Sequence, residues 1–134
     1  MGTLHMKRIL NRKTMEIQSE EIREDIYAIK LILNHEGTVA GWAYVYIIKN
    51  DRHEEPYAFL ENVYIEQEYR SQGLGSRLVE GLIEEAKKRR CYKIIGTSRH
   101  TSTKVHEFYK KFGFRDHGLE FRLDLIDSKP KQRD

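Results

Sequence analysis

The sequence predicts a mixed α/β (α+β) fold, in which a mostly antiparallel central sheet contains one parallel pair of strands and is flanked by helices. Three β-prone runs follow one another between residues 26 and 65, separated by turn-forming or charged residues. The third run is followed in sequence by a glycine-bearing turn and a helical pattern. A further β-prone run comes directly after that helical pattern. A second helical pattern covers residues 102–112.

The composition fits one domain over residues 1–134, with residues 1–6 a tag or flexible start and residues 128–134 a flexible tail. The 134 residues are 39% hydrophobic, which is enough for one core and leaves no room for a second domain. The net charge of +3 is a small difference between 24 basic and 21 acidic residues, so it indicates neither a nucleic acid nor a membrane partner. The single cysteine, Cys91, and the lack of a long apolar run predict a cytoplasmic protein.

The first half of the chain reads as strands. Residues 15–18 alternate apolar with polar and predict a short strand. Residues 26–33 and 39–48 are β-branched and aromatic, and the turn-forming residues 34–37 between them predict a hairpin. Residues 57–65 add a third strand after a charged connection, so three antiparallel strands form a meander.

The second half alternates helices with strands. Apolar residues at 78, 79, 82, 83 and 86 give the first helix one buried face, and residues 92–97 should return as a strand parallel to 57–65. Ser102 and Thr103 can cap a second helix, which ends at Gly113. Phe114 and residues 119–126 are expected to supply one or two closing strands.

The turn at residues 70–76 reads Arg-Ser-Gln-Gly-Leu-Gly-Ser and opens the first helix. The first N–H groups of a helix lack partners within it and lie at the positive end of its dipole. Gly73 and Gly75 allow positive φ and a close approach to an anion, and the Arg70 guanidinium suits phosphate oxygens. The turn is a candidate phosphate site, while a plain helix-opening turn would use the same glycines.

Two motifs together resemble the GNAT N-acetyltransferase superfamily. Residues 70–75 match its Gln/Arg-x-x-Gly-x-Gly/Ala pyrophosphate loop, and residues 108–114 match the Tyr-x-x-x-Gly-Phe close of its second conserved segment. The resemblance covers about residues 59–114. Within the family, the chain looks most like spermidine/spermine-type acetyltransferases, through Phe59-Leu60-Glu61-Asn62 and Tyr69-Arg70.

The resemblance implies an acetyl-CoA site in a V-shaped opening between the strand at 57–65 and the strand that begins at Tyr92. The turn amides would bind the pyrophosphate, and the pantetheine arm would pair with a strand backbone as an added edge strand. The implied cofactor-binding residues are Val63, Tyr64, Ile65, Arg70, Ser71, Gln72, Gly73, Leu74, Gly75, Ser76, Ser102 and Tyr109. Ser102 replaces a common family asparagine and reaches less far. No metal is implied, since the histidines lack tight ligand spacing.

The family's reaction implies acetyl transfer to a primary amine, by direct attack on the thioester in a ternary complex. A lysine-like amine of pKa about 10.4 must first lose a proton, and Glu61 is the candidate general base. Glu61 should share a strand face with Val63, unless a bulge intervenes. A backbone N–H near Val63 would stabilise the negative charge that develops on the thioester oxygen. Tyr109 is the candidate general acid for the departing thiolate. The plainer alternatives are a solvated carboxylate for Glu61 and simple packing for Tyr109.

The chain departs from the family in the acceptor wall, the part of the fold that forms one side of the cleft for the acceptor amine. GNAT domains usually have two helices between their first two strands, and only about residues 19–25 are available for them here. The cleft is therefore either open to a protein lysine or N-terminus, besides small amines and amino acids, or completed by a second subunit in a homodimer. A non-catalytic acyl-CoA-binding regulatory module is the alternative. The basic segments, residues 7–13, 87–90 and 129–133, are separated in sequence and lack interleaved aromatics, which disfavours a nucleic-acid partner.

Overall fold

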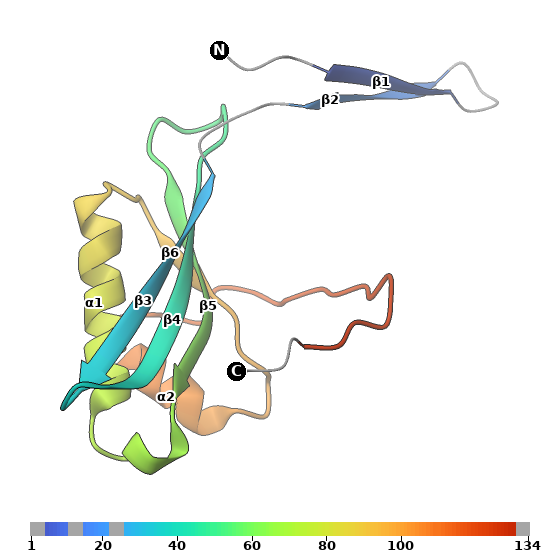
Figure 1. Cartoon of the computed structure of the whole chain (residues 1–134). Coiled ribbons are helices and arrows are strands. Elements are labelled where there is room, and N and C mark those ends of the chain that lie inside the picture. The colour runs from blue at the N-terminus through green and yellow to red at the C-terminus, as the bar shows by residue number, and fades with distance from the viewer. Residues whose placement is uncertain (1–4, 11–14, 22–25, 131–134) are drawn as a thin grey trace. The chain divides into compact units, whose positions relative to one another are not determined.

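The structure is a computed structural model that describes residues 5–10, 15–21 and 26–130 (Figure 1). It comprises two compact units, residues 1–96 and residues 97–134. Parts of three predictions lie outside the described residues: the first residues of the flexible start, residues 22–25 of the short acceptor wall, and the last four residues of the tail.

A separate two-stranded antiparallel sheet precedes the main sheet. Strand β1 (His5–Leu10) pairs with β2 (Glu16–Glu21), and Ile9 lies opposite Ile17. The strand predicted at residues 15–18 therefore exists and is longer than expected. Strand β1 was not expected, because its basic residues show no alternation with apolar ones.

The main sheet has the order β3–β4–β5–β6. Its strands are β3 (Tyr27–His35), β4 (Thr38–Ile48), β5 (Tyr57–Ile65) and β6 (Ile94–Gly96). The first two pairings are antiparallel and the third is parallel, which confirms the predicted mixed sheet. The hairpin turn at Glu36 and Gly37 has φ of 52° and 79°, the left-handed pair that a two-residue hairpin requires. Strand β6 is shorter than predicted.

Helix α1 (Leu74–Lys88) connects β5 to β6 and covers one face of the main sheet (Figure 1). It follows the short 3-10 helix η1 (Gln67–Tyr69). The apolar stripe of α1 is buried as predicted, through Leu78, Val79, Leu82 and Ala86, while Ile83 is half-buried. On the sheet side, the buried residues are Ala43, Val45, Ile47, Ala58 and Leu60. This layer is the hydrophobic core of the first unit.

The second unit contains helix α2 (Thr103–Lys110) and a long segment without regular structure. The helix lies where it was predicted, and Gly113 follows it with φ of 94°. The closing strands predicted at Phe114 and residues 119–126 are wrong, because residues 114–130 form no strand. A strand requires a hydrogen-bonded neighbour, which an alternating sequence cannot supply by itself.

Candidate active site

A β-bulge interrupts β5 directly after the candidate base. Glu61 lies opposite Tyr44 and Tyr64 lies opposite Trp42, so two residues of β5 face one residue of β4. Asn62 takes up the extra length with φ of 55°, a conformation that asparagine tolerates better than most residues. Its side-chain amide donates to Glu61 Oε1 at 3.0 Å. Both side chains are exposed.

The bulge places Glu61 and Val63 on different faces of the sheet. Glu61 and Tyr64 lie on the sheet face opposite α1, because their partners Tyr44 and Trp42 lie there. Val63, next to Tyr64, therefore lies on the α1 face. A shared face was expected only without a bulge, and the inserted residue shifts the two-residue period of the strand, so the two side chains lie on opposite faces.

Gly41 allows the close approach of β4 to β5 beyond the bulge. A Cβ at this position would collide with the carbonyl oxygen of Tyr64 and with the Ile65 side chain. Only glycine therefore fits without a shift of the two strands. The backbone from 62 to 65 is held in place from the β4 side.

The opposite edge of this stretch of β5 is open. Strand β6 pairs with β5 only at Ala58, Phe59 and Leu60, so in the described part of the chain residues 61–65 have no strand on that side. Unpaired backbone groups at such an edge can pair with an extended ligand. The predicted cofactor positions Val63, Tyr64 and Ile65 lie in this open stretch.

The turn before α1 has the geometry of an anion site. Ser71 and Gly73 have φ of 65° and 77°, and a Cβ at Gly73 would meet no atom within 4 Å. No side chain caps the helix, so the N–H groups at its start, from Leu74 to Ser76, lack a side-chain acceptor. Three consecutive amides at the positive end of a helix dipole fit a diphosphate.

Of the two glycines that allow positive φ, only Gly73 adopts it. Gly75 is the second residue of α1, and the second left-handed residue of the turn is Ser71. Gln72 is held at the turn through a hydrogen bond of its side-chain amide to the Glu68 carbonyl oxygen at 3.4 Å.

Arg70 is positioned by an aromatic neighbour. Its Nε–H donates to the Ile65 carbonyl oxygen at 2.9 Å, and its Cζ lies 5.4 Å from the centroid of the Tyr64 ring. The Tyr64 ring in turn stacks on Trp42, with centroids 4.8 Å apart. Both contacts leave the terminal NH₂ groups of Arg70 for a ligand at the turn. The sequence indicated Arg70 and did not indicate that the Tyr64 ring supports it.

Replacing Tyr64 with Leu is expected to weaken acetyl-CoA binding by about two- to fivefold, the value of an exposed cation–π contact. Replacing Arg70 with Ala should weaken it by roughly ten- to a hundredfold, because charge-assisted hydrogen bonds are lost. Isothermal calorimetry measures both constants. Tyr64→Phe is the control, since it keeps the ring and should bind within about twofold of the wild type.

The second unit carries the candidate acid. The Tyr109 ring packs edge-to-face on Phe108 and Phe114, with centroids 5.5 Å and 5.4 Å apart. Burial raises the pKa of the Tyr109 hydroxyl above its ordinary value. The hydroxyl therefore stays protonated at neutral pH, as a proton donor must. Among the described residues it has no hydrogen-bond partner.

Ser102 occupies the N-cap position of α2, and its side chain makes no capping hydrogen bond. The predicted capping through the Ser102 hydroxyl is therefore not observed. The half-buried His106 ring is held by a 2.8 Å hydrogen bond between its Nε2 and the Arg99 carbonyl oxygen. This contact gives His106 a structural partner within the loop before α2.

The described residues contain no cluster of three or more His, Cys, Asp or Glu side chains that could hold a metal ion. Within the same residues, none of the helices has the length and apolar character to cross a membrane. Cys91 is a free thiol, and burial raises its pKa, which makes the thiolate less available.

Residues 6–114 match the Acetyltransferase (GNAT) family, so the chain belongs to that family and the predicted resemblance is confirmed. The acyl donor of this family is acetyl-CoA. The finer likeness to spermidine/spermine-type enzymes stays a prediction.

Three relatives stand out in sequence or structure. The chain is 42% identical over 66 residues to a glucosamine 6-phosphate N-acetyltransferase of Trypanosoma brucei brucei, covering 49% of this chain and 43% of the relative. It is 29% identical over 99 residues to a putative [ribosomal protein bS18]-alanine N-acetyltransferase of Bacillus subtilis (strain 168), covering 74% and 62%. The chain thus spans less than two thirds of either relative. A crystal structure of a Trypanosoma brucei acetyltransferase has a TM-score of 0.65 at 34% identity, covering 73% and 69%.

Proposed function

We propose that the protein is an N-acetyltransferase that moves the acetyl group of acetyl-CoA to a primary amine. The observation that carries the proposal is the combination of the open β5 edge with the uncapped, left-handed turn before α1. The open β5 edge would bind the pantetheine arm, and the turn before α1 would bind the pyrophosphate. These two separate binding sites suit a cofactor with both a pyrophosphate and a long extended arm better than they suit a simple nucleotide.

In the proposed reaction the amine nitrogen attacks the thioester carbon, directly and without an acyl-enzyme. Glu61 accepts the amine proton, either itself or through water, and a backbone N–H near Val63 stabilises the oxyanion. The carbon–sulfur bond then breaks, and the Tyr109 hydroxyl gives its proton to the CoA sulfur. Ser102 is proposed to hydrogen-bond the pantetheine arm, because its hydroxyl is not used for capping.

The acceptor is a primary amine, of a sugar, a small molecule or a protein. The relatives' names point to two chemistries, the amine of glucosamine 6-phosphate and the amine of an alanine in a ribosomal protein. We propose a cytoplasmic location, which the unpaired thiol of Cys91 supports. The chain reaches only part of each relative, so the acceptor must be identified by assay.

The decisive experiment is calorimetry with acetyl-CoA, followed by a CoA-release screen over amino sugars, amino acids, polyamines and peptides. Binding at micromolar acetyl-CoA and release with at least one amine are expected. Binding without release on any amine would favour the non-catalytic acyl-CoA-binding module. No binding at all would contradict both functions.

Tyr109→Phe should reduce kcat by about ten- to a thousandfold while the Kd for acetyl-CoA stays within about twofold. The reduction follows from the loss of the proton donor, and it is limited because a thiolate of pKa about 8.5 leaves tolerably well without one. Since burial raises the pKa of Tyr109, the wild type should show no loss of this acid below a pH of about 10. Steady-state rates from pH 7 to 10 test both points.

Phe112→Leu is the packing control for this helix. Phe112 contacts Phe108 in the same aromatic cluster but has no hydroxyl to donate. If Phe112→Leu lowers kcat as much as Tyr109→Phe does, the effect comes from packing and Tyr109 is not the acid.

A further inference from the structure

We propose that the acceptor of this enzyme carries an anionic group, a phosphate or a carboxylate, besides its primary amine, and that Lys30 on β3 binds this group. The inference rests on the proposed acetyl transfer, because it places the anionic group relative to the amine that Glu61 deprotonates. It goes beyond that proposal by naming the class of acceptor. The residues that carry it all belong to the main sheet.

Lys30 and Glu61 lie in one cross-strand row. Lys30 of β3 is directly opposite Tyr44 of β4, and Tyr44 is directly opposite Glu61 of β5. Directly opposite residues point to the same face of a sheet, so all three side chains lie on the face away from α1. Two strand spacings, about 9.5 Å, separate the ends of the row. One small molecule can therefore contact both ends.

The Lys30 ammonium is held over the sheet by aromatic rings. Its Nζ lies 5.4 Å from the centroid of the Trp42 ring and 5.5 Å from the centroid of the Tyr44 ring. The Trp42 ring in turn stacks on Tyr64, with centroids 4.8 Å apart. Cation–π contacts of this kind restrict a lysine side chain without neutralising its charge. The ammonium is therefore positioned before a ligand arrives.

The charge of Lys30 has no opposite charge beside it in the sheet. Within the described part of the first unit, no carboxylate lies at ion-pair distance from Lys30. Glu61, at the other end of the row, accepts a hydrogen bond from Asn62 instead. A positioned ammonium without a carboxylate partner suits an anionic ligand. We call Lys30 with the rings of Trp42 and Tyr44 the anion site.

The two ends of the row carry opposite charges, which orients the acceptor. An ammonium is attracted to Glu61 and repelled by Lys30, whereas an anionic group is attracted to Lys30 and repelled by Glu61. The row thus favours an acceptor whose amine lies toward β5 and whose anionic group lies toward β3. It disfavours an acceptor with a second cation in place of the anion, such as a polyamine.

Binding at the anion site can be measured without acetyl transfer, because Trp42 is the only tryptophan of the chain and lies beside Lys30. Glucose 6-phosphate has the anionic group but no amine, and acetate is the corresponding probe for a carboxylate. With CoA present to occupy the turn before α1, at least one of these probes should change the Trp42 fluorescence saturably at about 1–10 mM. Glucose, or potassium chloride at equal ionic strength, should not.

Substitutions of Lys30 test whether its charge binds the probe. Lys30→Met should abolish the saturable change, and Lys30→Arg, which keeps the charge, should retain it. Circular dichroism confirms that each variant is folded.

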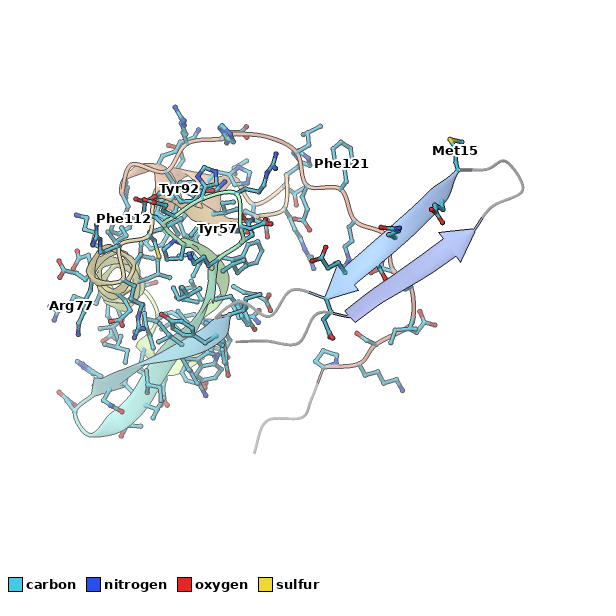
Figure 2. The ribbon with its side chains drawn as sticks, turned by 90° about the horizontal axis from the view of Figure 1, so that it is seen from above. Met15, Tyr57, Arg77, Tyr92, Phe112 and Phe121 are labelled. Carbon is cyan, nitrogen blue, oxygen red and sulfur yellow. The ribbon has the colours of Figure 1, made fainter. Side chains whose placement is uncertain are left out.

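Lys93→Met is the matched control. The Lys93 ammonium lies 5.1 Å from the ring centroids of both Tyr57 and Tyr92, which lie side by side (Figure 2). Lys93 therefore has the same kind of aromatic neighbours as Lys30, but it is not in the row with Glu61. Removing its charge should leave the titration unchanged.

Steady-state rates test the class of acceptor. Glucosamine 6-phosphate and glucosamine share their amine, so the ratio of their kcat/KM values measures what the phosphate contributes; γ-aminobutyrate and butylamine form the pair for a carboxylate. At least one pair should favour the anionic member by about tenfold, the lower end for a charge-assisted hydrogen bond. Lys30→Met should remove this preference through KM, with kcat within about twofold.

The outcomes separate this inference from the proposed function. Probe binding that depends on Lys30, without turnover of any amine, would support the anion site and contradict the proposed acetyl transfer. If neither glucose 6-phosphate nor acetate binds saturably, the anion site is wrong even where amines are acetylated. Equal probe binding by the wild type and Lys30→Met, or an unchanged preference for the anionic acceptor in that variant, would also overturn it.

Discussion

Replacing Glu61 with Gln is expected to lower kcat/KM for the acceptor amine by about 10²–10⁴ at pH 7, the usual contribution of a general base. Glutamine keeps the size of the side chain and can still accept a hydrogen bond from the Asn62 amide, as Glu61 does at 3.0 Å. It cannot take the proton that the ammonium group must lose. The Kd for acetyl-CoA should not change, because the side chain of Glu61 lies on neither of the two proposed binding sites.

The pH dependence distinguishes a base from an electrostatic role. Solvent deprotonates more of the amine as the pH rises toward its pKa, about 8 for an α-amine and about 10.4 for a lysine, so the defect of Glu61→Gln should shrink between pH 7 and pH 9.5. Initial rates at subsaturating acceptor measure this. Glu68→Gln, at an exposed position in η1, is the matched control and should leave the rate unchanged. A constant defect over the whole range would remove Glu61 as the base.

Leu82→Ala should have the largest effect on stability, a loss of about 2–5 kcal/mol in the free energy of unfolding. Leu82 is 0% exposed and lies in the stripe through which α1 packs on the main sheet. Alanine would leave a cavity between the two layers, and the fully buried side chains of these layers, such as Val79 on α1 and Val45 on β4, can close it only in part.

Urea denaturation measures this loss through the fluorescence of Trp42, the only tryptophan of the chain. Trp42 lies on β4 in the same unit, so its signal reports on the layer that the substitution disturbs. Glu80→Ala on the exposed side of α1 is the control and should change stability by no more than about 0.5 kcal/mol. A similar loss in both variants would mean that Leu82 is not central to the core.

The sequence correctly predicted the elements that depend on residues close together in the chain. The hairpin of β3 and β4, the buried stripe of α1 and the positive φ of Gly73 follow from periodicity and turn chemistry, and the structure contains all three. The parallel return of β6 follows from the helical crossover that connects it to β5, a rule that is equally general.

The misses come from interactions between segments. The sequence left open whether a bulge separates Glu61 from Val63, because the pairing of β5 with β4 decides this and the sequence of β5 alone does not. An asparagine inside an otherwise β-prone run was the only local signal, since asparagine is a common non-glycine residue at positive φ. The absence of a strand at 119–126 has the same origin, because alternation shows what a segment can do and not where its partner is.

The three-residue length of β6 has a consequence for the order in which the main sheet forms and opens. Strands β3, β4 and β5 are neighbours along the chain, whereas β6 pairs only after α1 has crossed the sheet. Of the pairings in the main sheet, β5–β6 closes the longest loop and forms the fewest strand-to-strand hydrogen bonds. It should therefore open most readily. Acetyl-CoA would then act as the missing continuation of β6. Its binding should slow amide hydrogen exchange at residues 62–65 far more than in β3, and the first unit would be completed by its substrate rather than by its own chain.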